Sequence, residues 1–125
     1  MEFLINVHAQ FLHKHSGKAL FGHDYSIRLF DQDPISDDFL GETKPDNEGK
    51  VQFKIDPALY RSEDSPLEKR PDFYLVVLKD SVEIFRTPVA LNVNVDDEGN
   101  FNFTDGEWVD LGTFIIDNGE LRMEN

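Results

Sequence analysis

The sequence predicts an all-β protein, built as a two-sheet antiparallel β-sandwich of about seven or eight strands. Three observations support this prediction. Apolar and polar residues alternate along much of the chain, turn-forming residues separate the alternating runs, and only one short segment has helical character. Because 125 residues with 39% hydrophobic content suffice for one core, we expect residues 1–125 to form a single domain.

Six alternating runs have the pattern of half-buried strands, with apolar side chains on one face and polar side chains on the other. They lie at residues 3–11, 25–29, 51–55, 91–95, 100–103 and 109–115. In the last run, one face is expected to carry Val109, Leu111, Thr113 and Ile115. The run from Phe73 to Leu78 is apolar at every position, which predicts a central strand covered on both faces.

Turn and helix signals separate these runs. Gly49 and Gly99 each end a polar stretch between two runs, and we expect both to take positive φ in hairpin-like turns. A short helix is predicted near residues 57–62, because Asp56 can cap it and Pro57 suits its first position. Residues 117–125 form an acidic tail that is expected to fray.

The net charge of −13, from 25 acidic and 12 basic residues, narrows the classes of partner. Direct nucleic-acid binding is disfavoured because the negative field repels phosphate, and anionic membrane surfaces are disfavoured unless calcium reverses the local charge. No apolar run approaches the roughly 18 residues needed to cross a bilayer, so we expect no membrane insertion. The lack of cysteine removes disulfides and thiolate chemistry.

The N-terminal sequence MEFLINVHAQF has the pattern of a strand. It lacks the basic start, the long apolar middle and the small-residue cleavage site of a signal peptide. Together with the lack of cysteine, this pattern predicts a cytoplasmic protein. A secretory leader that was trimmed away stays an open alternative.

The densest polar cluster lies in residues 29–43, LFDQDPISDDFLGET, which follow a strand with Asp31, Asp33, Asp37 and Asp38. Carboxylates this close repel one another unless water, amide N–H groups or a cation neutralise them. One interpretation is a calcium site at Asp31, Asp33 and Asp38, with Asp37 as a further candidate. The other is a connector, in which Asp31 and Asp33 accept hydrogen bonds from loop amides and Asp37 or Asp38 begins the next strand.

Two further groups have weaker patterns. His13, His15 and His23 form a His-x-His pair with a third histidine across a turn, which would suit zinc or nickel, but exposed loop histidines are the commoner explanation of this pattern and are what we expect. Trp108 begins the last run, and we expect it to be a core residue at a sheet edge rather than a platform for a ligand. The sequence has no Gly-x-Ser-x-Gly motif and no Gly-rich phosphate loop.

Five segments in this order resemble the transthyretin-like (prealbumin-like) β-sandwich domains. They are SIRLFDQD, DDFLGET, PDNEGKVQF, RPDFYLVV and WVDLGTFII, and the similarity extends over roughly residues 3–116. The resemblance implies a sandwich of seven or eight strands. It also implies a binding, transport or accessory module rather than an enzyme.

One enzyme of this fold, hydroxyisourate hydrolase, is disfavoured. That family uses a histidine on the first strand, an arginine after an Asp-Gly turn, a late histidine and a C-terminal Tyr-Arg-Gly-Ser. Here His8 matches the first position, but Lys50 stands where the arginine is expected, the last strand at 114–116 has no histidine, and the chain ends in GELRMEN. The general acid and base groups of that reaction are therefore incomplete.

The sequence therefore predicts a non-enzymatic module that binds an unknown protein or small molecule, with homo-oligomers through exposed strand edges as an open possibility. The alternative is a calcium-dependent C2-like module using the Asp31, Asp33 and Asp38 loop. That loop is similar to the calcium loop of C2 domains, where Asp-x-Asp is followed by Asp, two apolar residues and Gly. Its spacing is one residue shorter, and it follows only about two strands.

Overall fold

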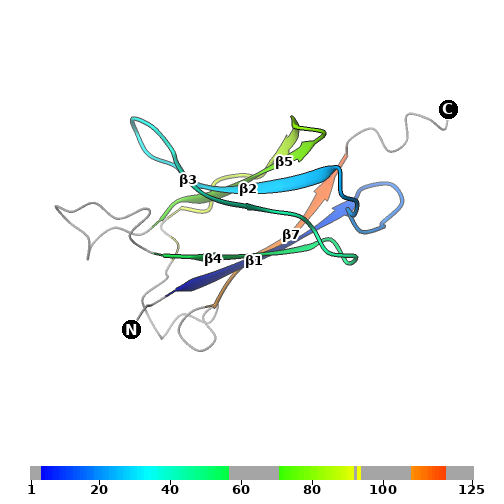
Figure 1. Cartoon of the computed structure of the whole chain (residues 1–125), viewed down its shortest axis with the longest axis horizontal. Coiled ribbons are helices and arrows are strands. Elements are labelled where there is room, and N and C mark those ends of the chain that lie inside the picture. Colours follow the sequence, from blue (N-terminus) through cyan, green and yellow to red (C-terminus); the bar gives the residue numbers. More distant parts are fainter. Residues whose placement is uncertain (1–3, 57–70, 92, 94–107, 118–125) are drawn as a thin grey trace.

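The computed structural model of the chain describes residues 4–56, 71–91, 93 and 108–117 (Figure 1). All regular structure in these residues is β. The strands are β1 (Ile5–His13), β2 (Tyr25–Asp31), β3 (Asp38–Thr43), β4 (Lys50–Ile55), β5 (Phe73–Lys79), β6 (Val82–Arg86) and β7 (Trp108–Ile116). They form two sheets, one with the order β4-β1-β7 and one with the order β3-β2-β5-β6. The two sheets lie one over the other, which confirms the predicted β-sandwich.

Some predictions fall on other parts of the chain. The helix near 57–62, the run at 100–103, Gly99 and residues 118–125 lie outside the described residues, as does most of the run at 91–95. No helix in the described part of the chain is long and apolar enough to cross a membrane.

Neighbouring strands pair antiparallel except β1 and β7, which are parallel. Two parallel strands need a long connection between them, and here the connection between β1 and β7 contains strands β2 to β6.

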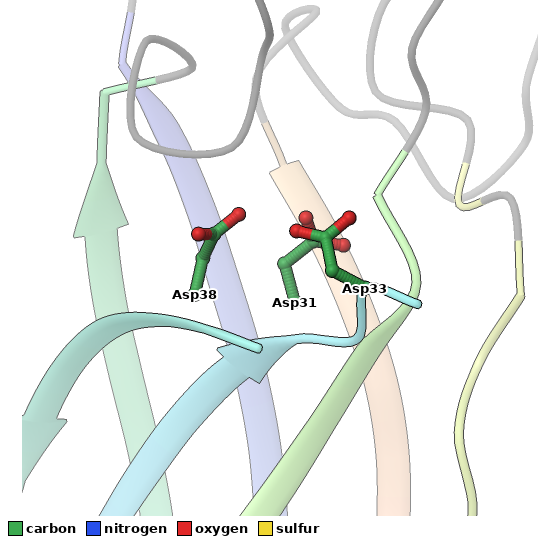
Figure 2. Close-up of side chains that lie close together, drawn as sticks. All are labelled: Asp31, Asp33 and Asp38. Carbon is green, nitrogen blue, oxygen red and sulfur yellow. The ribbon is translucent and has the colours of Figure 1, made fainter. Parts of the chain in front are cut away.

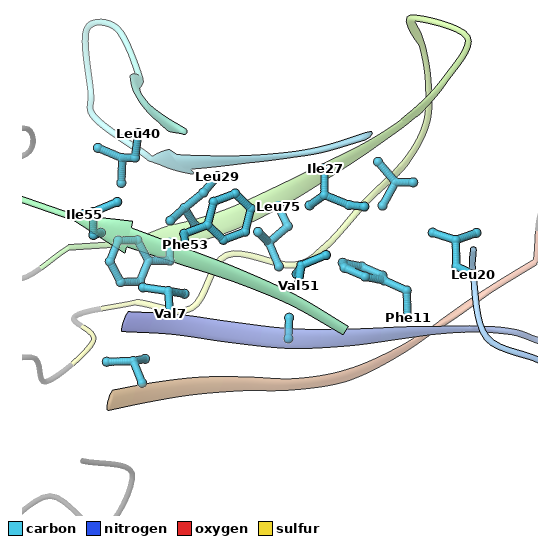
Figure 3. Packing of buried hydrophobic residues seen from close by; sticks show 14 of the residues in the cluster. Val7, Phe11, Leu20, Ile27, Leu29, Leu40, Val51, Phe53, Ile55 and Leu75 are labelled. Carbon is cyan, nitrogen blue, oxygen red and sulfur yellow. The ribbon is translucent and has the colours of Figure 1, made fainter. Parts of the chain in front are cut away.

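The predicted alternation on β1 is confirmed and defines the core. Its inward residues Ile5, Val7, Ala9 and Phe11 are buried, whereas the residues between them are half-buried. They pack against inward residues of the facing sheet, including Ile27, Leu29 and Leu75 (Figure 3). Burial of this apolar surface between the sheets is the main stabilising contribution to the fold.

The prediction of a central strand at 73–78 is also confirmed. β5 lies between β2 and β6, and all its residues but the last are buried. Phe73, Leu75 and Val77 belong to the core between the sheets. Tyr74, Val76 and Leu78 form a second cluster on the other face of the sheet, against Phe30 and Val89.

The predicted face of β7 is wrong beyond Leu111. His8 pairs with Asp110 and Gln10 with Thr113, so β7 holds one extra residue between these pairs. Gly112 has φ of 108°, and its N–H donates to Asp110 Oδ1 at 2.9 Å. This bulge reverses the alternation, so that Ile116 is buried whereas Ile115 is 51% exposed.

Gly49 has φ of 77°, as predicted for the turn before β4. Its carbonyl oxygen accepts a hydrogen bond from the Phe11 N–H at 2.8 Å. A Cβ atom at this position would overlap the Phe11 carbonyl oxygen. The glycine therefore lets the turn lie directly against β1.

Candidate functional site

A buried carboxylate ends the second strand. Asp31 takes the last inward position of β2, after Tyr25, Ile27 and Leu29, and its side chain has 0% exposure. Its Oδ1 accepts a hydrogen bond from the Asp72 N–H at 2.8 Å. This contact confirms the expectation that Asp31 accepts a hydrogen bond from a loop amide, and it fixes the orientation of the carboxylate.

Asp38 begins β3, as one of the two interpretations predicted, and pairs directly with Asp31 across the two strands. Like charges at directly opposed positions of an antiparallel pair repel each other. The repulsion between the two carboxylates is strengthened here because Asp31 is buried, and a buried charge is screened less than one in water.

Asp33 completes a three-carboxylate cluster. One oxygen from each of Asp31, Asp33 and Asp38 lies within 4.8 Å of the other two. Figure 2 shows the side chains directed to the same region above the end of β2. Two oxygens on one calcium ion at 2.3–2.6 Å can be at most about 5 Å apart, so this spacing is compatible with a shared ion.

Asp37 is not part of the cluster and holds the loop instead. Its Oδ1 accepts a hydrogen bond from the Asp33 N–H at 3.0 Å, and its Oδ2 accepts one from the Tyr74 hydroxyl at 2.5 Å. The Tyr74 hydrogen bond, together with the one from the Asp33 amide, lowers the pKa of Asp37. Asp37 therefore stays ionised and ties the loop at 32–37 to β5.

Tyr74 connects this loop to the second apolar cluster. Its ring stacks on Phe30 with centroids 5.2 Å apart, and the Arg86 guanidinium lies 5.2 Å from its centroid. Burial, with a further contribution from Asp37, raises the pKa of Tyr74 to about 12. The neutral phenol thus remains a hydrogen-bond donor to Asp37 over the physiological pH range.

The three histidines do not share a metal position. In the part of the chain that the structure describes, the Asp31, Asp33 and Asp38 group is the only set of three close metal-ligating side chains. His15 Nε2 lies 3.3 Å from Asp117 Oδ1, and the His13 ring meets the Tyr25 ring edge-on. The zinc or nickel interpretation of His13, His15 and His23 is therefore wrong for the described structure.

The expectation that Trp108 is a core residue is also wrong. Trp108 begins β7 as predicted, but it faces outward, is 39% exposed and stacks on His8 with ring centroids 3.6 Å apart. Both residues line an open cleft of about 660 Å³ on the outer face of the β4-β1-β7 sheet. The outward polar residues of strands β1 and β4 were visible in the sequence, but their convergence on this cleft depends on the strand order.

Comparisons with known proteins bear on the fold alone. No protein-family model and no curated protein matches the chain. Among solved structures, the chain is similar to a 9R-lipoxygenase from Cyanothece PCC8801, with a TM-score of 0.55 and 21% sequence identity. The match covers 92% of this chain and 17% of the lipoxygenase chain. A similarity at this identity supports the architecture and says nothing about activity.

Proposed function

We propose that this chain is a non-enzymatic binding module of the transthyretin-like type that binds a calcium ion at one end of its sandwich. The ligands are Asp31, Asp33 and Asp38. The observation that carries the proposal is the grouping of three carboxylate oxygens within 4.8 Å of one another, one of them from a side chain with 0% exposure.

The oxygen chemistry of the group favours calcium over softer metals. Calcium takes six to eight oxygen ligands, commonly carboxylates together with carbonyls and water. Three aspartates supply hard, negatively charged oxygens, and no sulfur or imidazole ligand belongs to the group. Water and carbonyl oxygens would complete the coordination.

Two contacts outside the group support it. The Asp72 N–H orients Asp31, and the Asp37 carboxylate holds the backbone N–H of Asp33. The backbone of the loop that contains Asp33 is therefore held in place without a cation, so less conformational entropy is lost when a cation binds.

Calcium would link the end of β2 to the start of β3. A cation between Asp31 and Asp38 would attract both carboxylates and outweigh their mutual repulsion, and Asp33 would attach the intervening loop to the same ion. The tip of that loop carries Ile35, which is 96% exposed. We therefore expect calcium to set the position of a surface segment available to a partner.

Membership of the transthyretin-like domains is part of the same proposal. It is supported by the order of the five sequence segments and by the two-sheet sandwich that contains them. The non-enzymatic assignment is supported by Lys50 and by the last strand, which replace groups that the hydrolase of this fold requires.

The test is thermal unfolding of metal-stripped protein with and without millimolar calcium. Calcium should raise the melting temperature of the parent by about 5 °C or more, because a ligand that binds only the folded state stabilises it. The Asp31→Asn, Asp33→Asn double variant should show no rise. Because Asp31 is buried, Asp33→Asn alone is included as a variant at a more exposed position.

A matched control removes two carboxylates at the opposite end of the same sheet, where the start of β2 pairs with the end of β5. Asp24 lies just before β2 and Asp80 just after β5. The Asp24→Asn, Asp80→Asn variant has the same charge change and should keep the full calcium response. A parent that does not respond, or a response that survives in Asp33→Asn and in the double variant, would refute the calcium site.

A further inference from the structure

The cleft on the outer face of the β4-β1-β7 sheet belongs to a different sheet from the carboxylate cluster. Its volume of about 660 Å³ lies within the range of roughly 300–1,000 Å³ typical of small-molecule sites. Outward side chains of β1, β4 and β7 form its floor, and residues 43–46 after β3 form part of its wall. The cleft is therefore built on paired strands rather than on a loop, which favours a fixed geometry.

The charged side chains of this cleft are already engaged in the structure. Lys44 Nζ donates to two backbone carbonyl oxygens at 2.8 and 3.2 Å, and Asp46 accepts from two backbone N–H groups at 2.8 and 2.9 Å. Lys50 Nζ lies 3.3 Å from a glutamate oxygen, and Asp110 accepts from the N–H of Gly112. Two positive and two negative charges balance here, in a chain whose net charge is −13. The lining thus favours an uncharged ligand.

The neutral polar side chains are held in place but retain unused hydrogen-bonding capacity. Gln52 Nε2 donates to Asn6 Oδ1 at 3.1 Å, and Gln10 Nε2 donates to the Glu48 carbonyl oxygen at 3.0 Å. Gln10 Oε1 also accepts from the Thr113 hydroxyl at 3.3 Å. Each glutamine amide has a second N–H, and Gln52 has its carbonyl oxygen, so the two residues that line the cleft retain both donors and an acceptor for a ligand.

The floor of the cleft also carries a flat aromatic surface. The His8 and Trp108 rings are nearly parallel, with an interplanar angle of 14°, and Trp108 is 39% exposed. His8 Nε2 is buried and makes no hydrogen bond in the described structure. Burial lowers the pKa of His8 from its ordinary value of 6.5, against the opposing effect of the Asp110 charge, and the lowered pKa favours the uncharged imidazole at neutral pH. The stacked pair therefore offers an uncharged plane beside the amides.

We propose that this cleft binds a neutral oligosaccharide, with a sugar ring against Trp108 and its hydroxyl groups on Gln10 and Gln52. A pyranose has an apolar face of C–H groups, which suits an indole, and hydroxyl groups that both donate and accept, which suit primary amides. The size of the cleft leaves room for more than one ring. This site does not depend on the calcium proposal, because the two sites share no residue.

Trp108 makes the test direct, because it is the only tryptophan in the sequence. Intrinsic fluorescence and the indole N–H signal in NMR spectra should be followed during titration with cellohexaose, xylohexaose, mannohexaose, maltohexaose and chitohexaose. At least one probe should give a saturable change in both signals at millimolar concentration or below. The same change should occur in the presence of a calcium chelator, whatever the outcome of the calcium experiment.

Variants locate the binding surface. Trp108→Ala should weaken the binding of the responding sugar at least about tenfold in calorimetry, and Gln52→Ala about threefold or more. Phe21→Ala removes an aromatic ring that is 59% exposed and lies outside the cleft, and it should leave the affinity unchanged. Gln52 is at an exposed position of β4, so Gln52→Ala is expected to fold, and it provides the test if Trp108→Ala does not fold.

Two results would overturn the proposal. The first is a parent protein whose Trp108 signals are unchanged by all five sugars. The second is a sugar that binds the folded Trp108→Ala or Gln52→Ala variant as tightly as the parent, which would place the ligand on another surface.

Discussion

The two sheets of this sandwich have different outer faces, although both have the same kind of inner face. On the four-stranded sheet, β5 directs Tyr74, Val76 and Leu78 outward, and all three are buried. On the three-stranded sheet, β1 directs His8 and Gln10 outward, where they line an open polar cleft. Packing on the outer face of the four-stranded sheet therefore adds to stability, whereas part of the outer face of the three-stranded sheet is an open cleft lined by polar side chains.

The largest difference should appear on removal of one outward side chain from each sheet. Tyr74→Ala loses the stacking on Phe30, the hydrogen bond to Asp37 and the contact with Arg86. We expect it to lower the free energy of unfolding by about 3 kcal/mol, as for other large-to-small changes of buried residues. Gln52→Ala, on the other sheet, should change it by no more than about 0.5 kcal/mol. Urea unfolding of both variants measures the two changes in the free energy of unfolding. Equal changes would contradict the distinction between the packed and the open outer face.

A second experiment compares a tightly packed glycine in the turn before β4 with an open glycine in β7. Gly49 and Gly112 both have positive φ, but only at Gly49 would a Cβ atom meet other atoms within 4 Å. Gly112→Ala should therefore lower the free energy of unfolding by about 1 kcal/mol, because an alanine at positive φ is strained but its Cβ atom meets no other atom. Gly49→Ala should cost about 2 kcal/mol or more, because the Phe11 backbone must also shift. The same urea measurement compares them, and a larger loss for Gly112→Ala would contradict the described packing.

The smallest expected effect is a difference in pH response between the two outer faces. The pKa of His8 is lowered by burial from its ordinary value of 6.5, so below that pH the unfolded chain binds a proton that the folded chain does not. The stabilising contribution is complete above about pH 6.5 and falls as the pH falls towards the lowered pKa. Tyr74, with a pKa of about 12, contributes nothing in this range.

His8→Gln tests this response, because glutamine cannot take up the proton. The parent should lose more stability than the variant between about pH 7 and about pH 5.5 in urea unfolding. NMR titration of the His8 ring signals gives the pKa directly. A value at or above 6.5 would contradict the lowered pKa and show that burial of the ring does not outweigh the charge of Asp110.

The inner faces of the sheets were predictable from sequence because alternation is a local property. The four inward residues of β1 and the continuous apolar run of β5 follow from period 2 and from the lack of polar positions. The reversal on β7 was not predictable in this way. One extra residue beside Gly112 moves Ile116 into the core, and a bulge depends on the pairing with β1 rather than on β7 itself.

The candidate sites were predictable only in part, for a related reason. The sequence indicated that Asp31, Asp33, Asp37 and Asp38 lie close together, but the β2–β3 register decides that Asp38 faces Asp31. The Tyr74 hydroxyl, 37 residues away in the sequence, holds Asp37 outside the group. The cleft was not predicted, because its floor combines three strands whose order cannot be read from any one of them.

The parallel pairing of β1 with β7 has a consequence for how the chain folds. Gln10 and Thr113, which are hydrogen-bonded across these strands, are 103 residues apart in the sequence. Closing so long a segment costs chain entropy before any contact compensates for it, and such non-local pairing is associated with slow folding. During synthesis, the edge of β1 that pairs with β7 would stay unpaired until β7 has left the ribosome. Until β7 is available, that edge of β1 offers unpaired N–H and C=O groups with which a strand of another chain could pair.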